Sequence, residues 1–121
     1  MYLFLTSQTK TTLTITDMTL KNFIFKDANI FTAPLAAAKI DILNVILDKC
    51  IFSNSIFLLD DYSASDRISK YIRVRNFTVR DSYFFESRLF ALEDVNYFRV
   101  NGLKITGSYF YSSGGSQVSL I

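Results

Sequence analysis

The chain has 121 residues, the length of a single domain, and half of them are hydrophobic, which excludes an intrinsically disordered chain. Twelve Phe and seven Tyr against four Gly and one Pro favour strands over helices. The net charge of +2 gives no sign of a nucleic-acid binder, the lack of His removes the usual general base and metal ligand, and the single Cys excludes an internal disulfide.

The first residues contain no basic segment, and their apolar run is shorter than the core of a signal peptide. No stretch approaches the roughly 18 consecutive apolar residues of a membrane helix, so we expect no membrane span in this segment. Residues 2–5 are interpreted as the late strand of a coil that precedes the first full repeat.

A repeat of four copies follows, beginning near residues 13, 40, 72 and 98. Each copy has apolar residues at alternate positions, a turn-type residue in the middle, a second bend, and then an apolar-x-aromatic segment. Alternation with period two predicts short strands that each bury one face. The repeat therefore predicts one β-helix segment over residues 1–121, with coils near 13–38, 40–70, 72–96 and 98–121.

The central turn position of each copy holds Asp, Asn or Gly, the residue types that tolerate a left-handed backbone. These positions lie 27, 32 and 26 residues apart, while the spacings inside each copy are identical. We expect such bends to turn the chain so that successive copies stack as coils about 4.8 Å apart. The predicted turn column is Asp17, Asn44, Asn76 and Gly102, and a second bend is predicted at Asn22, Lys49, Asp81 and Gly107.

Equivalent side chains of successive coils should then lie on top of one another. Cys50 is predicted to be a buried, inert thiol, and Asn76, although it begins an N-glycosylation sequon, is predicted to face the interior. A hydrophobic pair after the aromatic position is expected to be equivalent in three copies, at Ile30-Phe31, Ile56-Phe57 and Leu89-Phe90. The two predicted core columns are Ile15, Ile42, Val74 and Val100, and Phe25, Phe52, Phe84 and Phe110.

This repeat, over about 100 of the 121 residues, resembles the right-handed parallel β-helix of the pectin-lyase-like superfamily. The resemblance implies an all-β, single-stranded, right-handed solenoid of about four coils, a handedness that parallel crossovers also favour. An antiparallel β-sandwich is the alternative fold, but it does not explain the recurring spacings. Neither end carries a polar cap, so we expect a solenoid that is uncapped at both ends, and that is either a piece of a longer protein or a protomer completed by its neighbours.

Charged residues are expected on the outward face of the first strand of each coil. In stacked coils Asp41 would lie beside Arg73, and Asp48 would lie between Lys21 and Arg80. One interpretation is a ladder of surface ion pairs that sets the register. The resemblance implies the other, a polysaccharide lyase site in which several carboxylates hold Ca²⁺ and an Arg abstracts a proton, but only Asp41 stands on that face.

A basic cluster is the densest charge feature, and we interpret it as a solvated strand face. The alternative is that it attracts a sulfated glycan, a nucleic acid or an anionic surface. Exposed aromatic residues such as Tyr62, Tyr97 and Tyr111 offer rings for sugar stacking. The basic cluster consists of Arg67, Lys70, Arg73, Arg75 and Arg80.

We therefore predict a protein that is not an enzyme, with no catalytic residue, metal or cofactor. The predicted function is a structural or adhesin-like segment of an extracellular or cell-surface protein, a rigid scaffold for assembly or binding. Its expected partners are further coils of the same protein or neighbouring subunits, and glycans, but not nucleic acid. The alternatives are a piece of a polysaccharide lyase or hydrolase, or a glycan-binding module, with key residues outside this chain. Candidate binding residues are Asp41, Arg73, Arg99 and Tyr62.

Overall fold

The computed structural model describes residues 4–5, 11–33, 37–60, 71–92, 95 and 97–113. Within these residues the chain forms twelve β-strands and no helix. The strands form three four-stranded sheets, and every pair of neighbouring strands is parallel. The all-β fold built of stacked parallel strands, with about four coils, is therefore confirmed.

Three sheets make up the sides of the coils. The long sheet has the order β11-β8-β5-β2 and contains β2 (Thr11–Lys21), β5 (Ala37–Asp48), β8 (Tyr71–Arg80) and β11 (Tyr97–Thr106). The short sheet has the order β12-β9-β6-β3 and contains β3 (Ile24–Lys26), β6 (Ile51–Ser53), β9 (Tyr83–Phe85) and β12 (Tyr109–Tyr111). The third sheet has the order β1-β4-β7-β10 and contains β1 (Phe4–Leu5), β4 (Asn29–Ala33), β7 (Ile56–Asp60) and β10 (Arg88–Ala91).

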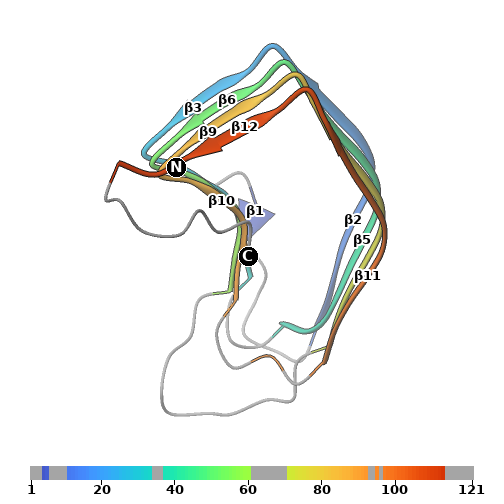
Figure 1. Ribbon diagram of the computed structural model, residues 1–121. Helices are drawn as coiled ribbons and strands as arrows, with labels where there is room; N and C mark the ends of the chain where they lie inside the picture. The colour runs from blue at the N-terminus through green and yellow to red at the C-terminus, as the bar shows by residue number, and fades with distance from the viewer. Residues whose placement is uncertain are drawn as a thin grey trace.

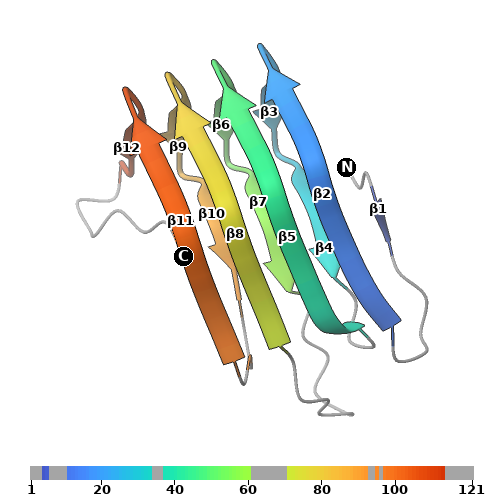
Figure 2. The same ribbon diagram turned by 90° about the vertical axis from the view of Figure 1, so that its right-hand side faces the viewer.

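Each of the first three coils runs up the long sheet, across the short sheet and back along the third sheet, and the described part of the fourth coil comprises β11 and β12 (Figure 1). Seen from the end of the molecule nearest β11 and β12, the path turns counterclockwise and advances toward the viewer from the blue to the red coil. The side view shows the four long strands next to one another in chain order and pointing the same way (Figure 2). The solenoid is therefore right-handed.

Left-handed backbone conformations form the bends, as predicted. The φ angles at the turn column are 54°, 56°, 54° and 76°, and the second bend has positive φ in every coil as well. The first bend does not separate two strands, however, because each long strand continues through it and pairs on both sides. A third bend, between the short and third sheets, was not predicted; its left-handed residues are Asp27, Asn54 and Glu86.

The turn column is also a ladder of side-chain hydrogen bonds. Asn44 Nδ2 donates to Asp17 Oδ1 at 2.9 Å, and Asn76 Nδ2 donates to Asn44 Oδ1 at 3.1 Å. The same contact recurs at the third bend, where Asn54 Nδ2 donates to Asp27 Oδ1 at 2.8 Å. The prediction that Asn76 faces the interior is wrong: its side chain lies on the exposed outer side of the bend. The reason is that a left-handed residue interrupts the in-out alternation of the strand.

Both predicted core columns are confirmed by the register. Ile15, Ile42, Val74 and Val100 pair successively, as do Phe25, Phe52, Phe84 and Phe110. The Phe rings follow one another with centroids 4.9, 4.5 and 4.4 Å apart. Val100 and Phe110 are only partly buried, whereas their partners in the two middle coils are nearly inaccessible.

The predicted equivalence in the third sheet is wrong by one residue in the second coil. Phe31 pairs with Leu58, and Leu58 pairs with Phe90, so the pair equivalent to Ile30-Phe31 is Phe57-Leu58. Strand β1 extends this sheet, because Phe4 pairs with Phe31. The interpretation of residues 2–5 as a late strand is therefore confirmed for the two of them that the structure describes.

Candidate functional site

The predicted pair of Asp41 and Arg73 is formed across neighbouring strands of the long sheet. Arg73 Nε donates to Asp41 Oδ1 at 2.8 Å and Arg73 Nη2 donates to Oδ2 at 3.1 Å, a bidentate contact. The exposed fractions of the two side chains are 15% for Asp41 and 31% for Arg73. Both carboxylate oxygens of Asp41 are thus engaged by one guanidinium.

This contact shifts the pKa values of both groups. The hydrogen bond from Arg73, aided by the charges of Arg73, Lys39 and Arg75, holds the pKa of Asp41 below its ordinary value of 3.8 against the opposing effect of burial. The same bond raises the pKa of Arg73. Asp41 is therefore an ionised structural carboxylate, and a general base would need the opposite shift.

The other predicted binding residues are placed differently. Arg99 pairs in register with Arg73, is exposed, and makes no hydrogen bond or ion pair with any residue in the described part of the chain. Tyr62 lies outside the described residues. The structure therefore brings together Asp41, Arg73 and Arg99 along one column of the long sheet.

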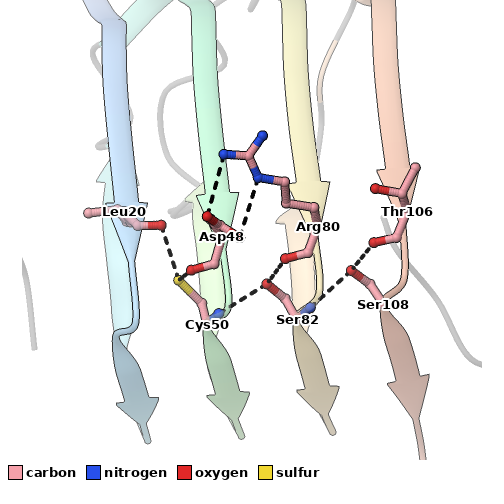
Figure 3. Close-up of polar contacts among 7 residues, drawn as sticks. All are labelled: Leu20, Asp48, Cys50, Arg80, Ser82, Thr106 and Ser108. Carbon is pink, nitrogen blue, oxygen red and sulfur yellow. Dashed lines mark hydrogen bonds and ion pairs between the residues drawn. The ribbon is translucent and has the colours of Figure 1, made fainter.

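A second charged column crosses the long sheet at its junction with the short sheet (Figure 3). Asp48 lies between Lys21 and Arg80 in register, as predicted. Arg80 Nε is 3.3 Å from Asp48 Oδ1, and Arg80 Nη2 donates to Oδ2 at 3.4 Å. The carboxylate of Asp48 is buried, with 8% of its side chain exposed. Its pairing with Arg80 is accordingly part of the coil-to-coil packing.

Serine side chains close the corners of the coils, and the sequence did not reveal them. Ser82 Oγ accepts the Cys50 N–H at 3.0 Å and donates to the Arg80 carbonyl at 2.9 Å (Figure 3). Ser108 repeats this pattern toward Ser82. A similar column at the third bend links Ala28, Ser55 and Ser87. Because each hydroxyl is engaged as donor and acceptor, these serines are structural groups.

Cys50 occupies the same corner column, and the prediction that its thiol is buried is confirmed. Its Sγ lies 3.3 Å from the Leu20 carbonyl oxygen and 3.5 Å from that of Asp48. Burial raises the pKa of the Cys50 thiol. The thiol therefore fills a serine position without the reactivity of a nucleophile.

The outward face of the short sheet is apolar, which is the second feature that the sequence did not reveal as a unit. Six of its eight outward residues are aliphatic or aromatic. Ile24 and Tyr109 are the most exposed, at 72% and 64%. Tyr83 and Tyr109 stack with centroids 5.3 Å apart, and Phe85 contacts Tyr111. The apolar residues of this face are Ile24, Ile51, Tyr83, Phe85, Tyr109 and Tyr111.

Among the described residues, no three His, Cys, Asp or Glu side chains gather as they would to hold a metal ion. In the same residues no helix is long and apolar enough to cross a membrane. No family model, no curated protein and no solved structure matches the chain.

Proposed function

We propose that the chain is a non-enzymatic, structural segment of a β-helix of the pectin-lyase-like kind, which assembles with neighbouring copies through its short sheet. The exposed apolar face of that sheet carries the proposal. Soluble monomers rarely expose a contiguous apolar patch of more than a few hundred Å², and larger patches mark interaction surfaces. We place this scaffold in an extracellular or cell-surface, adhesin-like protein.

The shape of the face suits packing against another protein surface. Tyr83 and Tyr109 stack, so each ring covers one face of the other and presents its edge to solvent. A sugar would stack on a ring face, whereas rows of ring edges and Ile side chains interdigitate with similar rows. A second short sheet is therefore a better occupant than a glycan.

Rigidity is the second requirement of a scaffold. Parallel pairing joins the first three coils to one another in all three sheets, and joins the fourth coil to the third in the long and short sheets. Phe rings pack across all four coils, and side-chain hydrogen bonds link the bends of the first three. Such repetition leaves few weakly held segments in the described coils. The coils therefore hold the short sheet as a straight, stiff surface.

The alternative is a piece of a polysaccharide lyase or hydrolase. It would need carboxylates free to bind Ca²⁺ or transfer a proton. Asp41 is bound bidentately by Arg73, and Asp48 is buried against Arg80. This engagement of both carboxylates favours the structural proposal.

Sedimentation of the purified chain over a range of concentrations tests the proposal. We expect wild type to associate, and the triple variant I51T/Y83T/Y109T to stay monomeric with a similar melting temperature. Y97T, which changes an exposed ring on the long sheet, is the matched control and should associate like wild type. A wild-type chain that is monomeric throughout would overturn the proposal.

Turnover assays on acidic polysaccharides address the alternative. We expect wild type to release neither unsaturated nor reducing sugar ends. Release that disappears in D41N would establish the enzymatic alternative instead.

A further inference from the structure

We infer that the outward face of β8 and β11 binds a sulfated polysaccharide. This inference is independent of the proposed function, because it concerns the long sheet and not the short one. It begins with the distribution of charge. Strands β8 and β11 carry five basic residues and no acidic one, although the whole chain has 13 basic and 11 acidic residues. The five are Arg73, Arg75, Arg80, Arg99 and Lys104.

The arrangement of these charges is unfavourable for the protein alone. Arg99 lies directly beside Arg73 in register, and like charges in opposed positions destabilise a pair of strands. The Nε and Nη2 of Arg73 already donate hydrogen bonds to Asp41, which lies on the opposite side of Arg73 from Arg99. Stability therefore explains Arg73 but gives no reason for Arg99.

Three of the five cations have no acidic partner among the described residues. Arg73 and Arg80 are paired with Asp41 and Asp48, whereas ion pairs to Arg75, Arg99 and Lys104 are absent from the described part of the chain. Arg99 and Lys104 are exposed, whereas the Nε of Arg75 is shielded from solvent and makes no hydrogen bond. An exposed guanidinium without an acidic partner, such as that of Arg99, is the kind of group that an anionic ligand binds.

The geometry favours sulfate over carboxylate. Arg73 shows that a single guanidinium saturates both oxygens of a carboxylate. Cations from two strands, about 4.8 Å apart across the sheet and about 7 Å apart along a strand, are better met by a group with three acceptor oxygens. Sulfate esters along a polysaccharide supply such groups repeatedly and keep their charge at any physiological pH.

The neighbouring aromatic residues favour a polysaccharide over a nucleic acid. Tyr71 and Tyr97 lie at the start of β8 and β11 with centroids 4.5 Å apart and an interplanar angle of 2°. Proteins that bind single strands offer separate ring faces for successive bases. Here each ring covers one face of the other, so the pair does not offer separate faces to successive bases.

The test is binding of a fluorescent heparin oligosaccharide to the full chain at low salt and at about 0.15 M salt. We expect binding at low salt that weakens steeply at the higher concentration. The double variant R99S/K104S should weaken it about tenfold, which is the effect of two modest charge contacts. K26S, on the outward face of the short sheet, is the matched control and should bind like wild type.

Binding of two other polyanions distinguishes between the possible classes of ligand. Polygalacturonate should bind more weakly than heparin, and single-stranded DNA of similar charge should do the same. No heparin binding at low salt, or equal weakening by K26S, would overturn the site. Tighter binding of polygalacturonate would overturn the preference for sulfate, and tighter binding of DNA would overturn the assignment to a polysaccharide. Melting temperatures of both variants establish that they are folded.

Discussion

The outward faces of the long sheet and the short sheet belong to the same coils and share the same register, yet they differ in chemistry. The long sheet presents paired and unpaired charges, such as Asp41 with Arg73, whereas the short sheet presents bare Ile and Tyr side chains. Their inward faces are alike, with Val74 and Phe84 equally buried. Stacking therefore dictates what points inward and leaves each outward face free to acquire its own partner.

The largest expected effect comes from a core position of the short sheet. Phe52 is inaccessible and packs between Phe25 and Phe84, so Phe52→Ala should lower the free energy of unfolding by about 3–5 kcal/mol. Tyr109→Ala, on the outward face of the same sheet, should change it by about 0.5 kcal/mol or less. Urea unfolding of both variants measures the contrast, and similar losses would show that the two faces are not distinct.

A smaller loss is expected at the corner where the two sheets meet. Ser82→Ala removes the acceptor of the buried Cys50 N–H and should cost about 1–3 kcal/mol. Cys50→Ser is the matched variant, because it places in this column the residue that the next two coils already have. It should cost about 1 kcal/mol or less. Thermal unfolding of both variants and of wild type measures these losses. A Ser82→Ala protein as stable as wild type would contradict the role of the corner serines.

A modest gain is expected where the turn column lacks a side chain. Gly102 has a φ of 76°, and a Cβ there would lie 3.0 Å from Asn76 Oδ1. Asn tolerates this backbone and can continue the ladder, so Gly102→Asn should add about 0.5–1 kcal/mol to the free energy of unfolding. Gly102→Val should instead destabilise the chain, because a β-branched residue is strained at positive φ. The same unfolding experiment compares them, and equal effects would refute a specific ladder.

The smallest effect is expected at the ion pair of the long sheet, and it depends on pH. Arg73 lowers the pKa of Asp41 in the folded protein, so this pair stabilises the fold fully above the unfolded pKa of about 3.9 and less as pH falls through the lower folded value. Asp41→Asn should therefore lower the melting temperature by a few degrees at pH 7, and the difference should vanish in acid. A difference that is constant from pH 7 to pH 3 would mean that the carboxylate charge is not responsible.

The sequence predicted the long and short sheets because their strands alternate strictly between bends. In the third sheet apolar residues follow one another, as in Phe57 and Leu58. The alternation of apolar and polar residues is then missing, so the sequence does not show which residues of successive coils are equivalent. The one-residue error arose there. The first bend was recognised because all four copies hold Asp, Asn or Gly, and the second because three of its four copies do, whereas the third bend has Glu86 in its third copy and escaped notice.

The candidate site was predictable only in part. The column of Asp41, Arg73 and Arg99 follows from the spacing alone. The corner serines did not emerge, because Ser at a bend is typical of an exposed turn and Cys50 obscures the column. The face of the short sheet did not emerge because its outward residues change from Ile to Tyr between coils.

All variation in coil length falls between the third sheet and the next long strand. Residues bonded across consecutive coils differ by 27, 32 and 26 in number, and the short and long sheets keep this register apart from one shift at Thr11/Thr12. A foreign peptide grafted between β7 and β8 should therefore leave the strand pairing of the long and short sheets intact. Grafts at the same point of successive coils would be displayed one above another at a fixed spacing.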